Sequence, residues 1–501
     1  MPAHVDWGTA AALTIVTVAA FFTYVYRFDD PAVPIWDERY YIVAAEKYLH
    51  GVYFQDLHPP LGKLLIAAGE RLAGRNASTA NFLNVTYWAE KIPPGLSFFG
   101  FRLIPVALAW LTAPVLCALF IAVTRSRALG LILSALYVFD NALVAHLRAA
   151  MLEGPLLFFT AVALLAFVHL EEDVSGTARR TRLRAAVLGA ALGCAVMTKA
   201  VGLSLAVLPL ALVWRRRADR RAALECAALV ALPAAVVACA VWMTHFALAR
   251  HVNPALLDGG YYQVPSVGTR TFIEGTGRVP IATLPAQIVD WIRYVNWYDQ
   301  SRPTIDLCRV DEHASPAWMW PIGARAVPYW WDAGGGGAFR YIYLQVNPIV
   351  WGTALAALLL TVASLAATTA GLAVRPLRHR FLVVSLLTTY AAYFALISTV
   401  RGVMYLYHYF IPLLFSFVLA AVAIDAIDQV GRRRLTAIDK RAALVAWTVV
   451  VVAAFLVYRP LTYFERRLNT DDLARRNLVP LWDLRCPGCP HTDGLCRGVT
   501  R

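Results

Sequence analysis

Charged residues are scarce in this sequence of 501 residues, because Asp, Glu, Lys and Arg make up only 16% of it, against about 25% in an ordinary soluble domain. Acidic residues are the scarcer kind, at 32 against 46 basic ones, so the formal charge is +14. Hydrophobic residues make up 59%, which excludes a disordered chain, a coiled coil and a small disulfide scaffold. They gather into runs of roughly 18 or more residues, long enough to cross a hydrocarbon core of about 30 Å. The composition therefore predicts a polytopic membrane protein.

A basic chain could bind nucleic acid, but the placing of its basic residues argues against that partner. They form short clusters between the apolar runs, at 125–127, 179–184, 215–221, 375–380 and 432–441. Short loops rich in Lys and Arg stay on the cytoplasmic side of a membrane. We therefore expect these loops inside, and no nucleic-acid partner.

With those loops inside, the apolar runs predict an all-α polytopic membrane protein of about eleven transmembrane helices with extracytoplasmic loops. The expected spans are 8–27, 101–123, 129–146, 154–170, 185–198, 201–214, 223–247, 346–370, 381–398, 405–427 and 442–458. The expected domains are an N-terminal transmembrane catalytic module at 1–247 with a first outer loop at 28–100, a second extracytoplasmic loop at 248–345, a four-span module at 346–458 and an extracytoplasmic tail at 459–501. Within the first outer loop, apolar residues recur at helical spacing over 40–49 and 61–72, which predicts two amphipathic helices along the membrane surface.

Polar residues crowd the outer membrane face, where the carboxylates Asp37 and Glu38 follow the first span within PIWDERYY. Cationic residues are expected at the same face: Arg102, Arg148, Lys199 and Arg401. The alternative readings are a solvated acidic pair and arginines that snorkel to the interface. Ionisable residues at a membrane edge are expensive and usually functional, however. A carboxylate can take a proton from a hydroxyl nucleophile while cations hold a phosphate leaving group, so a lipid-phosphate substrate would suit this site.

The string DERYYIVAAEKYLHGVYFQDLHPPLGKLL, with His58 and Lys63, resembles the first luminal loop of the protein O-mannosyltransferases, a branch of the superfamily C membrane glycosyltransferases. Further segments resemble that family in order along the chain: FRLIPV with Arg102, RAAMLEGPLLFF with Arg148 and Glu153, MTKAVGLS with Lys199, SPAWMWPIGARAVPYWW, and RGVMYLYHYFIPLLF with Arg401, His408 and Tyr409. The second outer loop is too short for the soluble β-rich module of eukaryotic members, so the chain resembles the compact bacterial-type members.

This resemblance implies inverting transfer of mannose from a polyprenyl- or dolichyl-phosphate carrier to Ser or Thr hydroxyls of translocated proteins. It implies Asp37 and Glu38 as catalytic residues, with Asp37 as the base. The residues it implies for the donor phosphate are Arg102, Arg148, Lys199 and Arg401. The residues it implies as supports of the site are His58, Lys63, Glu153, His408 and Tyr409.

The implied partners are the lipid-linked sugar donor, a Ser/Thr-containing protein acceptor, the membrane and the secretion translocon. The implied location is the bacterial plasma membrane, or the endoplasmic reticulum membrane in a eukaryote, with the site on the extracytoplasmic face. Two other functions stay open, namely a lipid-carrier glycosyltransferase acting on a lipid or polymer, and a transporter. A transporter would be expected to show paired internal repeats, and none is visible.

No metal or other cofactor is required by this reading. A divalent cation stays open, and one Asp–Glu pair supplies too few oxygen ligands to argue for it.

The cysteines fall into two groups. Cys117, Cys194, Cys226 and Cys239 lie in expected spans, and Cys308, Cys486, Cys489 and Cys496 lie in segments expected outside. An oxidising outer compartment favours disulfides in the second group. A zinc site with His491 is the alternative, given the CxxC spacing of the tail.

Overall fold

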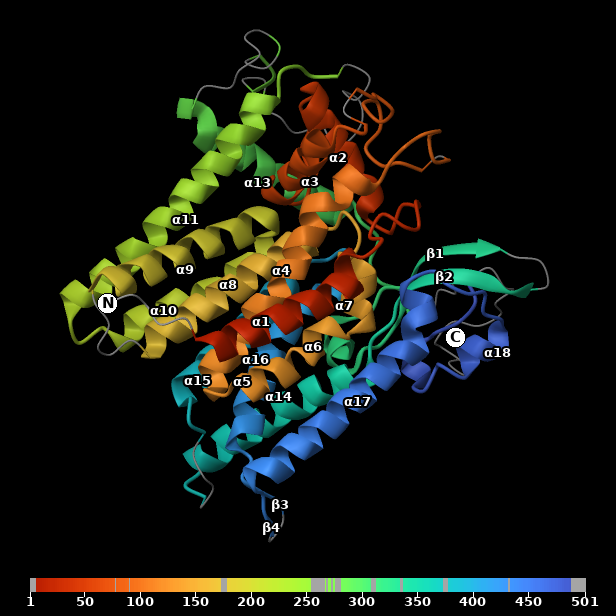
Figure 1. The fold of residues 1–501 in the computed structure, drawn as a ribbon. Helices are drawn as coiled ribbons and strands as arrows, with labels where there is room; N and C mark the ends of the chain where they lie inside the picture. The colour runs from red at the N-terminus through yellow and green to blue at the C-terminus, as the bar shows by residue number, and fades with distance from the viewer. Residues whose placement is uncertain are drawn as a thin grey trace, which may run out of the picture.

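The structure is a computed structural model that describes residues 6–76, 78–89, 91–172, 178–253, 266, 269–271, 274, 281–307, 312–333, 337–372, 377–430 and 433–487. In the N-terminal half the helices are α1 (Trp7–Ala20), η1 (Phe21–Val25), α2 (Glu38–His50), α3 (Leu61–Ala73), α4 (Phe99–Thr124), α5 (Arg127–Leu133), α6 (Ala135–Val138), α7 (Asn141–Leu147), α8 (Glu153–Glu172), α9 (Ala178–Thr198), η2 (Ala200–Ala206), α10 (Val207–Arg215) and α11 (Arg220–Leu248). In the C-terminal half the elements are η4 (Ile281–Thr283), α13 (Leu284–Ser301), η5 (Ala317–Ile322), β1 (Val327–Ala333), β2 (Phe339–Leu344), α14 (Pro348–Thr369), α15 (Arg380–Ile397), η7 (Leu406–Tyr409), α16 (Phe410–Ala426), β3 (Gln429–Val430), β4 (Arg433–Arg434), α17 (Ala437–Thr462), α18 (Thr470–Ala474) and η8 (Pro480–Trp482). Figure 1 shows a helical bundle with β1 and β2 paired at one end.

Nine of the described helical segments are long and apolar enough to cross a membrane. They are α1 with η1, α4, α8, α9, α11, α14, α15, η7 with α16, and α17. The pair formed by α5–α6 and α7, bent by 64°, gives a tenth candidate. The shorter apolar helix Ala200–Arg215 stands where the remaining span is predicted. The predicted all-α polytopic membrane fold is confirmed, and every predicted span overlaps one of these segments.

The bend before α7 is built around Asp140, a buried carboxylate inside the bundle. Its Oδ1 accepts from the backbone N–H of Leu143 at 2.9 Å and so caps α7. Its Oδ2 accepts from the backbone N–H of Asn347 at 3.2 Å and from the indole N–H of Trp351 at 3.0 Å. A buried polar group must be hydrogen-bonded to be tolerated. Asp140 therefore breaks one span and anchors the start of α14 to it.

The arginine-rich loops lie together at one end of the bundle. Asp6 pairs with Arg127 at 2.8 Å, and Arg125 pairs with Glu172 at 3.3 Å. His379, before α15, contacts the carbonyl oxygen of Val123 at 2.9 Å. Exposed ion pairs contribute little stability, but these contacts show which segments are neighbours. They place the amino-terminal end of α1 and the loops after α4, α8 and α14 side by side.

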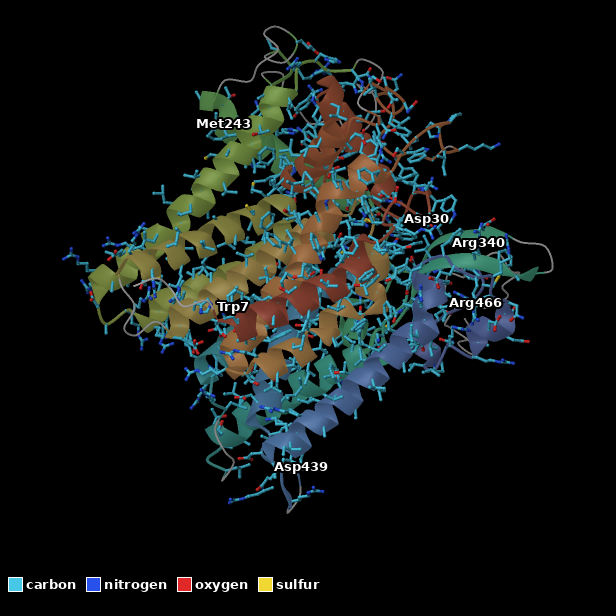
Figure 2. The ribbon with its side chains drawn as sticks, in the orientation of Figure 1. Trp7, Asp30, Met243, Arg340, Asp439 and Arg466 are labelled. Atoms are coloured by element: carbon cyan, nitrogen blue, oxygen red, sulfur yellow. The ribbon has the colours of Figure 1, made fainter. Side chains whose placement is uncertain are left out.

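The opposite end holds α2, α3, the β1–β2 hairpin and α18 (Figure 1). The two amphipathic stretches predicted in the first outer loop are helical, as α2 and α3. Figure 2 places Asp30, Arg340 and Arg466 toward this end and Trp7 and Asp439 toward the other. The bundle therefore has one end rich in basic loops and one end built from the long connections.

The chain after α17 packs back onto the β1–β2 hairpin. Phe339 in β2 forms an isolated antiparallel bridge with Leu468, and the backbone N–H of Ala326 donates to the carbonyl of Trp482 at 2.7 Å. Cys486 is disulfide-bonded, in line with the expected disulfides. The predicted disulfide partners Cys308, Cys489 and Cys496, and the alternative zinc ligand His491, lie outside the described residues.

Close helix packing in the N-terminal half depends on glycine. Gly189 and Gly193 on α9 face α11, and a Cβ at Gly189 would overlap the carbonyl oxygen of Val230. A Cβ at Gly193 would lie 2.9 Å from the carbonyl oxygen of Ala234. Small residues four apart let membrane helices approach closely where no hydrophobic driving force holds them together. This contact fixes α9, whose carboxyl end leads to Lys199.

Candidate active site

Asp37 lies at the end of the loop that follows η1, as the residue that precedes α2. Its side chain is only half-buried, and its Oδ2 accepts a hydrogen bond of 2.7 Å from the hydroxyl of Tyr407. Burial raises the pKa of Asp37, and the Tyr407 hydrogen bond and the nearby Lys199 oppose that rise. Asp37 thus presents a carboxylate with a raised pKa at an accessible position.

The residue before this carboxylate has a strained backbone. Trp36 adopts a left-handed φ of 47°, which is an outlier for a bulky side chain and is held only where the surroundings enforce it. The ring of Trp36 packs against Tyr329, with centroids 5.5 Å apart, and against Tyr405, with centroids 5.1 Å apart. These aromatic contacts hold the turn that presents Asp37.

Glu38 points the other way and is fully buried in an ion pair with Arg102. Arg102 donates from Nε to Oε1 at 2.7 Å and from Nη2 to Oε2 at 2.8 Å. The remaining donors of Arg102 bond to the backbone carbonyls of Phe28, Pro31 and Val33. An arginine has five N–H donors, and all are used here. In this arrangement Glu38 and Arg102 brace the loop that carries Asp37 and face no open space.

A second cluster lies beside Tyr407. Lys199 is buried and its Nζ donates to Oε1 of Glu153, while the Nζ lies 5.4 Å from the centroid of the Tyr407 ring. The other carboxylate oxygen of Glu153 contacts Nε2 of His146 at 2.8 Å. Tyr407 therefore joins the two halves of the site, with its hydroxyl on Asp37 and its ring against Lys199.

His146 adds a third layer to this cluster. Its Nδ1 contacts the hydroxyl of Tyr329 at 2.5 Å, and its ring stacks on Tyr407 with centroids 4.8 Å apart. The chain Tyr329–His146–Glu153–Lys199 is continuous, so every polar group in it has a partner. Such a network holds the lysine ammonium at a defined position.

Arg148 is engaged with backbone carbonyls, as Arg102 is. Its guanidinium donates to Tyr26 O at 2.9 Å and to Arg27 O at 2.6 Å, with longer bonds to Thr23 and Tyr24. It fixes the segment between η1 and Asp37. Arg401 is exposed, and its backbone N–H donates to Asp299.

The predicted supporting residues of the first loop form a separate brace. Lys63 donates from Nζ to the carbonyl of His58 at 2.6 Å and pairs with Asp56 at 2.6 Å. Burial and the nearby lysines Lys199 and Lys63 hold the pKa of His58 well below its usual range. A neutral imidazole therefore lies close to Lys199.

The other two predicted supporting residues, His408 and Tyr409, lie in different places. The ring of His408 stacks on Tyr407 with centroids 4.4 Å apart, which places it beside the site. The hydroxyl of Tyr409 instead lies 3.2 Å from that of Tyr390 on α15. The structure thus gathers Asp37, Lys199, Glu153, His58 and His408 and leaves Tyr409 at a helix contact.

Sequence reasoning missed His146, Tyr329, Tyr407 and Trp36. His146 carried a signal, because it is an ionisable residue inside an expected span. Tyr407 lies next to His408 in the segment already singled out, but nothing in the sequence distinguishes it from the other tyrosines of YLYHYF.

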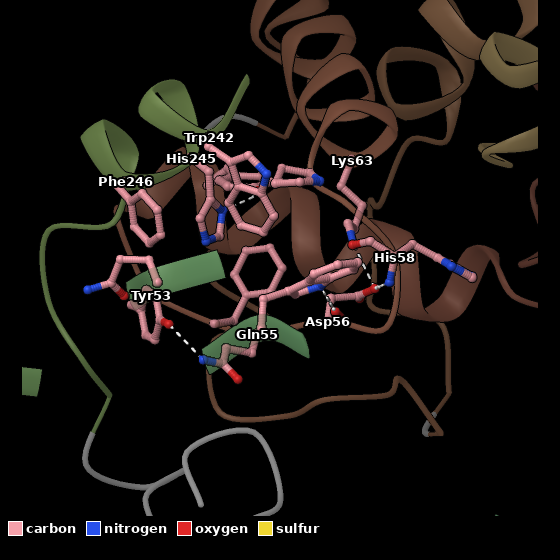
Figure 3. A pocket seen from close by; sticks show the side chains of 13 residues that line it. Tyr53, Gln55, Asp56, His58, Lys63, Trp242, His245 and Phe246 are labelled. Carbon is pink, nitrogen blue, oxygen red and sulfur yellow. Dashed lines mark hydrogen bonds and ion pairs between the residues drawn. The ribbon is translucent and has the colours of Figure 1, made fainter. Parts of the chain in front are cut away.

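A small pocket lies beside this site, between the 53–63 segment, α11 and α13 (Figure 3). Tyr53, Trp242 and Phe246 form its aromatic side, and Asp56 with Lys63 its polar side. Its free space is about 20 Å³, enough for a single water, so it is too small for a sugar. Asp37 is not among its lining residues.

Among the residues that the structure describes, no group of three or more His, Cys, Asp and Glu is arranged to hold a metal ion.

Comparison with known proteins matches two families to the chain. Residues 14–249 match the family "Dolichyl-phosphate-mannose-protein mannosyltransferase", and residues 296–482 match the "C-terminal four TMM region of protein-O-mannosyltransferase". Dolichyl-phosphate-mannose–protein mannosyltransferase 1 of Candida albicans is 30% identical over 192 residues, which are 38% of this chain and 21% of that protein. Protein O-mannosyltransferase 1 of Drosophila melanogaster is 30% identical over 158 residues, 32% of this chain and 17% of the relative. The matched part thus spans about a fifth of the length of these relatives.

Among solved structures, the S. cerevisiae protein O-mannosyltransferase Pmt1–Pmt2 complex bound to the sugar donor matches with a TM-score of 0.78 and 15% identity, over 96% of this chain and 93% of that one. The Archaeoglobus fulgidus oligosaccharyltransferase in the apo form matches with a TM-score of 0.52 and 13% identity, over 95% of this chain and 59% of that one. At these identities the likeness shows a shared fold.

Proposed function

Because the chain belongs to the protein O-mannosyltransferase family, we propose that it transfers mannose from a polyprenyl- or dolichyl-phosphate carrier to Ser or Thr hydroxyls of proteins. The observation that carries this proposal is the half-buried Asp37 carboxylate beside the buried Lys199, with Tyr407 contacting both. A base and a cation next to each other suit displacement of a phosphate by a hydroxyl.

In the proposed step the acceptor oxygen attacks the anomeric carbon from the face opposite the phosphate. The new bond joins that oxygen to C1, and the bond between C1 and the phosphate oxygen breaks, with its electron pair leaving on the prenyl phosphate. The hydroxyl proton passes to Asp37. Attack from the opposite face inverts the configuration at C1.

Lys199 is the cation proposed to stabilise the charge that grows on the leaving phosphate. Its pairing with Glu153 makes a buried ammonium tolerable before the donor binds, since a buried charge must be paired. We assign Glu38, Arg102 and Arg148 a positioning role in place of the catalytic and phosphate roles expected from the sequence, because the Glu38 carboxylate, all donors of Arg102 and both Nη groups of Arg148 are already hydrogen-bonded.

The proposed location follows from the two ends of the bundle. The site lies at the end opposite the arginine-rich loops, and such loops stay in the cytoplasm. We therefore place the site on the extracytoplasmic face, in a bacterial plasma membrane or, in a eukaryote, in the endoplasmic reticulum membrane. An acceptor protein would reach it after passing the translocon. In the proposed domain division, 1–247 carries the base and the lysine, and 346–458 supplies Tyr407.

The test incubates the purified protein with radiolabelled mannosyl-phosphoprenol and a Ser/Thr-rich peptide, with a matched Ala peptide as control. Labelled Ser/Thr peptide is expected, whereas label in lipid alone would favour the lipid-acceptor alternative. General-base catalysis contributes about 10²–10⁴ in rate, so Asp37→Asn should lower turnover by roughly that factor. Asp332→Asn, a carboxamide control in the β1–β2 hairpin, should retain normal turnover. If Asp37→Asn kept more than about a tenth of the wild-type rate, Asp37 could not be the base.

A further inference from the structure

The phosphate of the proposed donor is a diester with one negative charge, and a second negative charge develops on the prenyl phosphate as it leaves, so an additional cation would stabilise the leaving group. Two of the four cations expected there, Arg102 and Arg148, spend their donors on the protein. Lys199 is one ammonium, already paired with Glu153. A second cation with free donors near Lys199 would therefore help to hold the leaving phosphate.

Arg302 meets that requirement. It directly follows the last residue of α13 and is half-buried. Its Nη2 donates to the carbonyl of Val403 at 2.7 Å, and its guanidinium lies 5.8 Å from the centroid of the Tyr298 ring. Within the part of the chain that the structure describes, its Nε and Nη1 have no hydrogen-bond partner. Because Nη2 has two N–H groups and one of them is used on Val403, one two-donor edge of the guanidinium, either Nε with Nη2 or Nη1 with Nη2, stays open for a ligand.

The position of Arg302 is fixed by the segment that leads to Tyr407. Asp299, one turn earlier on α13, accepts from the backbone N–H groups of Arg401 and Gly402, with contacts of 3.2 Å to each. Arg302 lies directly over Gly402, where a Cβ would come within 2.9 Å of its Nε. Glycine at this position therefore leaves room for the guanidinium.

The charge interactions of Arg302 place it near Tyr40 and His408. Arg302 acts electrostatically on Tyr40, three residues after Asp37, where burial raises the tyrosine pKa and the arginine opposes the rise. His408, whose ring stacks on Tyr407, interacts electrostatically with both Lys199 and Arg302. Lys199 and Arg302 therefore both lie within electrostatic range of His408, whose ring stacks on the Tyr407 that donates to Asp37.

Building on the proposed function, we propose that Arg302 is a phosphate-binding residue of this site, which meets the phosphate of the prenyl carrier with its free edge while Lys199 meets it from within the bundle. A planar guanidinium suits this task because it can place two parallel N–H groups on two phosphate oxygens. The Val403 carbonyl and Gly402 hold that plane in place before the donor arrives.

The test measures binding, without turnover. Farnesyl phosphate, farnesol and inorganic phosphate are titrated into the detergent-solubilised full chain, with intrinsic tryptophan fluorescence as the readout. Losing a charge-assisted hydrogen-bonded pair should weaken farnesyl phosphate binding of Arg302→Ala by about 10- to 100-fold. Farnesol binding should stay unchanged, and Arg302→Lys should fall between the wild type and Arg302→Ala.

Two further variants sharpen the result. Arg293→Ala, which removes an exposed arginine of the same helix, should bind like the wild type. Gly402→Ala leaves Arg302 intact but displaces it, so it should weaken farnesyl phosphate binding while sparing farnesol. It also replaces Arg302→Ala as the deciding variant if the latter does not fold.

An unchanged preference for farnesyl phosphate over farnesol in Arg302→Ala would overturn the proposal, and so would an equal loss of both ligands. If Arg401→Ala lost farnesyl phosphate binding and Arg302→Ala did not, the proposal would be overturned in favour of Arg401. Competition by inorganic phosphate at similar affinity would identify a site for free phosphate and overturn the lipid assignment. A wild type that prefers farnesyl phosphate yet transfers no mannose would refute the proposed function while leaving the phosphate ligand in place.

Discussion

Replacing Tyr407 with phenylalanine removes the hydroxyl that donates to Asp37 and leaves the aromatic ring against Lys199. A hydrogen bond to a charged group contributes about 1.5–3 kcal/mol, and 1.36 kcal/mol corresponds to one pKa unit. Because this hydrogen bond favours the carboxylate, its loss should raise the pKa of Asp37 further. The base is active only when deprotonated, so the acidic limb of kcat/KM should move to higher pH by about 1 to 2 pH units.

The assay follows mannosyl transfer to the Ser/Thr peptide from pH 4 to 9 for the wild type and the variant. Tyr390→Phe is the matched control, because it also loses one tyrosine hydroxyl but that hydroxyl lies on Tyr409, away from Asp37. Its acidic limb should coincide with that of the wild type. A Tyr407→Phe protein that folds normally and keeps the wild-type acidic limb would refute the link between this hydrogen bond and the base.

Three other expectations concern the fold. Arg102→Ala should lower the free energy of unfolding by about 3–5 kcal/mol, because it leaves Glu38 as an unpaired buried charge; a thermal melt as stable as that of the wild type would contradict the bracing role. Arg217→Cys should react with an impermeant thiol reagent only after permeabilisation, and labelling from outside would reverse the proposed orientation. Gly189→Ala should destabilise the α9–α11 contact by about 1–3 kcal/mol, measured by thermal unfolding, since its Cβ would overlap the carbonyl of Val230.

The membrane architecture was readable from the sequence because its signals are local. The length of an apolar run shows whether it can cross the membrane, and clusters of basic residues indicate cytoplasmic loops. The predicted spans accordingly overlap helical segments of the structure, including the bent pair before and after Asp140. The bend itself was not predicted, because it depends on donors from Asn347 and Trp351, about 200 residues further along the chain.

The sequence could not distinguish the roles of the two carboxylates. Asp37 and Glu38 are adjacent and of one chemical type, so the sequence treats them alike. The start of α2 turns the two side chains apart, which leaves Asp37 half-buried on Tyr407 and buries Glu38 against Arg102. The burial and the bonding partner of each side chain decide which of the two carboxylates can accept a proton. Neither can be read from the fact that the two residues are neighbours in the sequence.

By itself the sequence determined the class of protein, the spans, the end of the bundle that holds the polar residues and the presence of a carboxylate there, since hydropathy, charge and motifs depend on near neighbours along the chain. Only the tertiary structure decided which cations are free. Arg102 is held by Glu38 and by carbonyls of the first loop, and Arg148 is held by carbonyls at the end of the first span. Arg302, which no motif marks, keeps an open edge over Gly402. The physical reason is that a side chain binds a ligand only with donors that its own fold leaves unpaired, and those pairings join residues far apart in the chain.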